Sequence, residues 1–166
     1  AISQLTQTIN GKFGRIDVLI NTVGGYRAGK PVHETPLATW DFMLDLNART
    51  IFSACHAMLP VMLKNNHGVI INTSAKSGIS GGANAAAYSA SKSAVMRLTE
   101  SLAAEYKDAG IRVNSVMPST IDTPQNREEM PNADFSKWTT PEQIAAVMVF
   151  LASPAGRVIT GAHIPV

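Results

Sequence analysis

Short apolar runs alternate along this chain with longer helical stretches, and this alternation is the feature that most constrains its fold. A stretch such as 17–23 contains the short apolar run Val18-Leu19-Ile20 and is followed by two glycines, which is typical of a strand buried on both faces. Strands that are separated by helices form a parallel sheet with helices on both of its faces. We therefore predict a single α/β domain, residues 1–166, with strands at 17–23, 68–75, 112–117 and 159–166 and helices at 2–11, 36–65, 85–107 and 141–151.

Several boundaries of these elements can be placed. Thr140 before Pro141 is typical of a helix start, because the hydroxyl caps the first turn and proline is tolerated there. A break is expected near Asn47 within the stretch 36–65. The stretch 118–139 is expected to be irregular, and a loop of that length is usually a lid or a binding loop.

The composition narrows the classes of partner. Lysine and arginine number 14 and aspartate and glutamate 12, so the net charge is +2, a field too weak to indicate nucleic acid or an anionic membrane. No apolar run approaches the roughly 20 residues that cross a bilayer. Cys55 is the single cysteine, which excludes an internal disulfide and suits a reducing compartment. We expect a cytoplasmic protein that binds a small molecule, and neither nucleic acid nor a membrane.

Tyr88 and Lys92 form the strongest candidate catalytic pair. They stand four residues apart in a predicted helix, so the phenol and the ammonium lie on one face, one turn apart. A nearby cation stabilises a phenolate and thereby lowers the pKa of tyrosine from about 10 toward neutral pH. Such a tyrosine is suited to general acid or base catalysis at a hydroxyl or a carbonyl. Taken alone, this spacing is common by chance.

The order of motifs along the chain resembles that of the short-chain dehydrogenase/reductase family. The matching motifs are Asn21-Thr22-Val23-Gly24 after a strand, Asn47 in a helix, a serine-bearing strand end at 72–78, Tyr88 with Lys92, and the strand 110–118. The resemblance covers essentially all 166 residues. It implies a Rossmann-like sheet and an NAD- or NADP-dependent oxidoreductase that interconverts a carbonyl and a secondary alcohol on a small molecule.

The resemblance also implies roles for single residues. Tyr88 would transfer the proton, Lys92 would hold the cofactor ribose and lower the pKa of Tyr88, and Asn47 would anchor a water that relays protons. Hydride transfer would belong to the nicotinamide. The residues expected to bind the cofactor are Asn21, Val23, Gly24, Tyr88, Lys92, Pro118, Ile121 and Thr123.

The chain departs from the family pattern at the serine that polarises the substrate oxygen. The family places it thirteen residues before the tyrosine, where this chain has Ala75. Ser74 stands one place earlier, on the opposite face if the strand continues, and Ser77 stands two places later in the turn. Ser74 is taken as the candidate, with Ser77 as the other possible substitute.

The second departure concerns the family's N-terminal part. Its first strand, its glycine-rich phosphate turn and the following strand and helix have no counterpart in these residues. That turn supplies the helix N-terminus on which the dinucleotide pyrophosphate rests. The N-terminal part of the sheet is therefore expected to be missing. This leaves open whether these residues bind the NAD or NADP cofactor weakly or not at all. A truncated, noncatalytic remnant that acts as a folded oligomer or binding module is the alternative function.

Two further motifs suggest other enzymes. The stretch 24–30 matches a phosphate-binding P-loop as far as its lysine, but Pro31 offers neither the hydroxyl nor the amide that the motif requires. Ser80, between Gly78 and Gly82, fits the nucleophile elbow of a serine hydrolase, with Asp122 and His163 following in the appropriate order. A flexible glycine-rich loop follows Ser80 where the elbow requires a helix, so the hydrolase is the less favoured alternative.

The sequence indicates an oligomer and no metal site. The four histidines are scattered without the spacing of metal ligands. In the resembling family, the helices at 50–64 and 86–106 pack against their copies, so a homo-oligomer, a dimer or a tetramer, is expected. The apolar strand at 18–23 would also lie at a sheet edge, and an uncovered edge of this kind tends to acquire a partner.

Overall fold

The computed structural model describes all 166 residues and is built on a four-stranded parallel sheet. The strands follow the order β1-β2-β3-β4, so each strand lies beside its neighbours in the chain. Their bounds are Val18–Asn21 for β1, Gly68–Thr73 for β2, Ile111–Met117 for β3 and His163–Pro165 for β4. The sheet is therefore Rossmann-like, as predicted.

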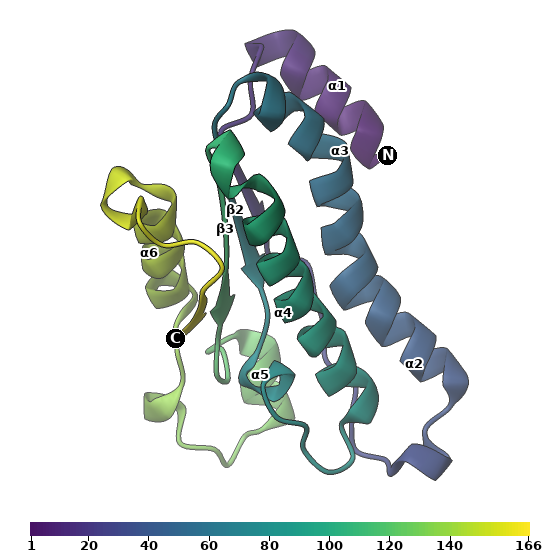
Figure 1. Cartoon of the computed structure of the whole chain (residues 1–166). Coiled ribbons are helices and arrows are strands. Elements are labelled where there is room, and N and C mark those ends of the chain that lie inside the picture. Colours follow the sequence, from purple (N-terminus) through teal and green to yellow (C-terminus); the bar gives the residue numbers. More distant parts are fainter.

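Helices cover both faces of the sheet, as the alternation predicts (Figure 1). Helices α2, α3 and α4 lie on one face, α6 lies on the other, and α1 packs against α3. The helices span Ile2–Phe13 (α1), Leu37–Leu44 (α2), Thr50–Lys64 (α3), Ala86–Tyr106 (α4), Pro124–Glu129 (α5) and Pro141–Ala152 (α6). No helix is long and apolar enough to cross a bilayer.

Two apolar cores hold the layers together. The larger core joins strand residues such as Leu19, Ile70 and Val113 to α3 and α4. The smaller core joins Val69, Ile71 and Val116 to α6. Because successive strand residues point to opposite faces, alternate positions of β2 serve the two cores.

The boundaries agree with the sequence at two important places. Thr140 accepts a hydrogen bond from the backbone of Gln143, whose side chain bonds back to Thr140, so α6 begins with a capping box. The predicted break at Asn47 is a π-helical turn, Asp45–Arg49, between α2 and α3. Turns of this kind are frequent at functional sites.

Two details differ from the sequence prediction. The stretch 118–139 is not wholly irregular, because Thr123 caps the short helix α5 by accepting a hydrogen bond from Asn126. Strand β4 is shorter than 159–166. Gly161, with φ of 74°, turns the chain just before it, and the amide of Gly161 donates to Val113.

Candidate active site

The predicted catalytic residues meet at the carboxyl end of the sheet. Asn21 and Thr73 end β1 and β2, and the hydroxyl of Thr73 donates to the carbonyl of Asn21 over 2.8 Å. Helix α4 brings Tyr88 and Lys92 to this end. In parallel α/β sheets, ligands bind outside the carboxyl ends of the strands, so the fold places these groups where a ligand would lie.

Lys92 is buried and turned toward the strand ends. Its side-chain amine donates to the carbonyl of Thr73 over 3.0 Å. Burial lowers the pKa of Lys92 from 10.5 to about 8. An ammonium has three donors, and the bond to Thr73 uses one of them, so two donors remain for the hydroxyls of a ligand.

Asn47 fixes the loop after β1 against the helices. Its side-chain oxygen accepts from the amide of Gly25 over 2.9 Å, and its side-chain nitrogen donates to the hydroxyl of Ser91 over 2.9 Å. A side chain added at Gly24 would come within 3.0 Å of the Asn47 oxygen and 3.1 Å of the Lys92 amine. Gly24, Asn47 and Lys92 therefore border one point.

A chain of buried polar side chains supports this edge of the sheet, and no sequence motif indicated it. The Asn21 amide donates to the Asn72 side chain over 2.9 Å, and Asn72 in turn donates to the Thr99 hydroxyl over 2.9 Å. The Thr99 hydroxyl then donates to the carbonyl of Val95. These bonds tie β1 and β2 to α4 and satisfy groups that would otherwise be costly to bury. Asn21 is thus engaged within the protein.

Tyr88 lies beside a second aromatic ring and a serine. The rings of Tyr26 and Tyr88 meet edge to face with their centroids 4.8 Å apart. Burial raises the pKa of Tyr88, and a hydrogen bond with Ser77 opposes that rise. The sequence predicted that Lys92 would lower this pKa. In this structure desolvation is the largest influence on the pKa of Tyr88 and raises it. The Lys92 amine lies 6.0 Å from the ring centroid. Tyr88 is therefore a neutral phenol at pH 7, suited to proton donation.

The three candidate positions around the missing serine are distinguished by their contacts. Ala75 is buried and offers no hydroxyl. Ser74 is buried, and its hydroxyl donates to the main-chain carbonyl of Lys92 over 2.9 Å. Because a hydroxyl carries one hydrogen, Ser74 has none to offer a substrate while that bond holds. Ser77 follows the strand in a short turn and lies against the phenol of Tyr88.

The remaining cofactor candidates also follow strand ends. Val23 is exposed beyond β1, and Pro118 directly follows β3. Ile121 forms a bridge with Thr139, and its carbonyl accepts from the Asn126 side chain. Thr123 uses its hydroxyl as the cap of α5. These residues come from the sheet edge that holds Lys92, although no hydrogen bond joins them to the Lys92 side chain.

These residues suit a nicotinamide dinucleotide. Lys92 has spare donors for ribose hydroxyls, and Gly24 allows the main chain to approach closely because a side chain there would crowd Lys92 and Asn47. Beside them, Tyr88 offers a neutral phenol that can give a proton. The arrangement is compatible with a site that holds a dinucleotide beside a phenol hydroxyl.

The hydrolase alternative does not find its partners in this structure. His163 bonds to the hydroxyl of Ser115 over 2.7 Å and to the Glu100 carboxylate over 2.9 Å. Asp122 pairs with Arg127. Neither group is hydrogen-bonded to Ser80, which is exposed in its loop. Ser115 is completely buried, so its hydroxyl is closed to substrate, and the trio links β3, β4 and α4.

Comparisons with known proteins identify the family of the chain. The family model described as enoyl-(acyl carrier protein) reductase matches residues 1–166. The meso-2,3-butanediol dehydrogenase of Serratia marcescens is 37% identical over 174 residues, covering 100% of this chain and 68% of that protein. The 2-(R)-hydroxypropyl-CoM dehydrogenase of Xanthobacter autotrophicus is 34% identical over 163 residues, covering 91% of this chain and 65% of that protein.

Solved structures give the same result. A structure described as ElxO with NADP bound has a TM-score of 0.92 at 28% identity, covering 99% of this chain and 71% of that one. An NAD+-bound xylitol dehydrogenase has a TM-score of 0.90 at 25% identity, covering 100% of this chain and 73% of that one. The chain belongs to the short-chain dehydrogenase/reductase family. It spans about two thirds of the length of these relatives.

Proposed function

We propose that this chain carries the catalytic centre of an NAD(P)-dependent oxidoreductase that interconverts a carbonyl and a secondary alcohol. The observation that carries the proposal is the convergence of Lys92, Asn47 and Gly24 at one point, with Tyr88 one helical turn from Lys92. The names of two relatives describe dehydrogenases of a butanediol and of a hydroxypropyl compound. These names support an alcohol as the reduced form of the substrate.

In the proposed reaction, Tyr88 donates its phenolic proton to the substrate oxygen during reduction and accepts it during oxidation. Lys92 holds the ribose of the cofactor, and Asn47 keeps the loop at 24–25 in place. The cofactor supplies or accepts the hydride when bound. Ser77 is the proposed donor that orients the substrate oxygen in place of Ala75, because its hydroxyl faces Tyr88 while Ser74 is bonded to main chain.

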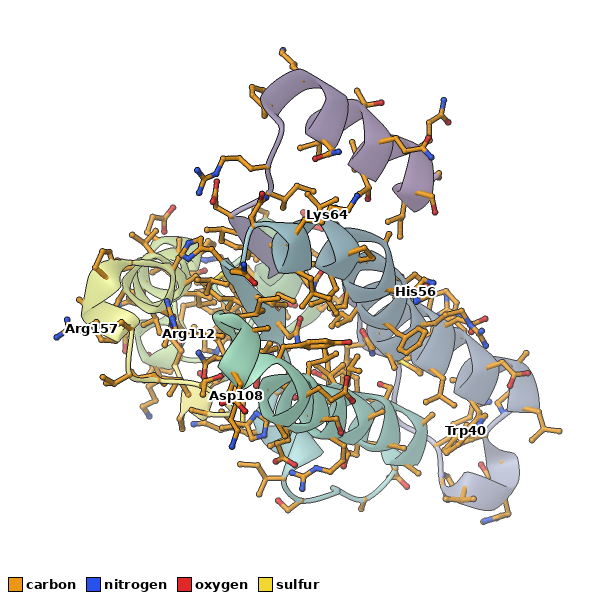
Figure 2. The ribbon with its side chains drawn as sticks, turned by 45° about the horizontal axis from the view of Figure 1, so that its top comes forward. Trp40, His56, Lys64, Asp108, Arg112 and Arg157 are labelled. Carbon is orange, nitrogen blue, oxygen red and sulfur yellow. The ribbon has the colours of Figure 1, made fainter.

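Titration of the full chain with NADH and NADPH, followed by nicotinamide fluorescence, separates this function from the noncatalytic remnant. Saturable binding of one of them is expected, with an affinity at least about tenfold lower in Lys92→Met, which removes the ribose donors. Lys64→Met is the matched control, because Lys64 is exposed near α1, at the end of α3 opposite the π-helical turn (Figure 2). Absence of saturable binding by the unmodified chain would favour the remnant.

The same protein is proposed to form a homo-oligomer through α3 and α4. Phe52 is 56% exposed and lines a shallow apolar groove with Leu44, Ala94 and Leu98. An exposed apolar groove of this kind is typical of a protein interface. Light scattering should give a dimer or larger, and Phe52→Asp should shift it toward the monomer. A monomeric unmodified chain would contradict the proposal.

A further inference from the structure

A cavity of about 440 Å³ opens beside Tyr88. One side is formed by the loop after β1, with Tyr26, Arg27 and Lys30, and the other by the start of α4, with Ala86 and Ala87. This volume lies within the range of sites that hold small molecules, roughly 300–1,000 Å³. The cavity is therefore large enough for a small metabolite.

The cavity adjoins the proposed proton donor. Ala87 lines it and directly precedes Tyr88 in α4. Tyr26 also lines it and contacts the Tyr88 ring edge to face. Tyr88 does not itself line the cavity, so its ring lies next to the cavity, beside Tyr26 and Ala87. A substrate that reacts at the phenol has this cavity as an adjacent space for its remaining atoms.

All the charged side chains that line the cavity are positive. Its charged lining residues are Arg27 and Lys30, and no aspartate or glutamate lines it. Neither cation forms an ion pair with a carboxylate of the chain. The carboxylate of Glu34, which is near in sequence, pairs with His33 instead. The Arg27 guanidinium lies over the Phe42 ring, 3.7 Å from its centroid, which holds it in place.

The start of α4 adds to this field. Ala85 stands at its N-cap and supplies no side-chain hydrogen bond to the first turn. The uncapped amides carry partial positive charge toward the cavity. This contribution supplements the two cations and does not itself define the ligand.

We infer that the cavity binds the carboxylate end of the substrate, so that the enzyme acts on short hydroxy or oxo carboxylic acids. Arg27 is the principal ligand, because its planar fork matches a carboxylate with two parallel hydrogen bonds. Lys30 supplies the second positive charge. The inference rests on the proposed function, since it assigns the substrate class of the same site.

The test compares acetoacetate with acetoacetamide, a neutral molecule of nearly the same shape. Each is titrated into the full chain while the backbone amide resonances of residues 26–30 and 84–88 are followed by NMR. Acetoacetate should bind saturably and at least about tenfold more tightly than the amide, because charge-assisted hydrogen bonds are the stronger ones. Arg27→Gln should abolish that preference.

Arg157→Gln is the control variant. Arg157 is exposed and lies far from Trp40, the neighbour of the cavity residue Thr39 (Figure 2). It should keep the preference. Equal affinities for the two molecules, no binding of either, or an unchanged preference in Arg27→Gln would overturn the inference. Because the readout is binding, the preference can hold even if Tyr88 proves dispensable for turnover, so the two proposals fail separately.

Discussion

The two faces of the sheet differ in how completely they are covered. On the face of α3 and α4, the core extends across the sheet from Leu19 of β1 to Val113 of β3. On the other face, α6 covers β2 and β3 but not β1. Ile71 is 0% exposed there, whereas its register partner Ile20 is 41% exposed.

This difference shows how the site can be well formed beside an open edge. The groups at the proposed centre are fixed by the covered face, through the buried bonds of Asn47, Lys92 and Ser74. Strand β1 contributes a loop to the site but lacks a neighbour on its outer side. Site geometry therefore depends on α4 and the π-helical turn more than on the exposed side of β1.

The largest expected effect is a core substitution on the covered part of the α6 face. Ile71→Ala should lower the free energy of unfolding by about 2–5 kcal/mol, because it removes buried methyl groups and leaves a cavity. Chemical denaturation followed by circular dichroism measures the change. A loss below about 1 kcal/mol would mean that Ile71 is not packed as described.

The next largest effect is the pH dependence that the buried Lys92 gives to the free energy of unfolding. Its pKa falls from 10.5 to about 8 on folding, so between these values the unfolded chain binds more protons and stability rises with pH. The unmodified chain should therefore gain stability relative to Lys92→Met as pH increases from 8 to 10, by about 2 kcal/mol. Parallel unfolding curves of the two proteins at both pH values provide the measurement. If the difference in stability between the two proteins is the same at both pH values, the Lys92 amine is hydrated in the folded protein.

A smaller effect is expected at the substitute serine. Ser77→Ala should lower turnover of a carbonyl substrate roughly tenfold, because one hydrogen bond to the reacting oxygen is lost. Adding Ala75→Ser to that variant should restore part of the rate. Ser80→Ala serves as the control and should leave the rate unchanged. If Ser77→Ala is equally active, the assignment fails.

The smallest effect is expected at the open edge. Ile20→Ala should cost no more than about 1 kcal/mol, because the side chain already contacts solvent and little area is lost. Comparison with Ile71→Ala under the same conditions isolates the effect of coverage. A cost equal to that at Ile71 would indicate that a second chain or another segment covers β1.

The alternation of apolar runs with helical stretches was enough to predict a sheet of parallel strands with helices on both faces. The break at Asn47 and the start of α6 at Thr140 were also predictable, because their signals are local. The contacts of Ser74 and Ser77 were not, since a residue's face at the end of a strand depends on where the turn begins. The direction of the pKa shift at Tyr88 required the burial of its ring, which no spacing reveals.

The turnover rate of Tyr88→Phe shows whether the Tyr88 hydroxyl transfers the proton. The rate of NADH or NADPH oxidation with acetoacetate or acetoin is compared with that of Tyr106→Phe, which removes a hydroxyl at the far end of the same helix. We expect a loss of roughly a hundredfold or more in Tyr88→Phe and little change in Tyr106→Phe. Near-normal turnover of Tyr88→Phe would contradict it.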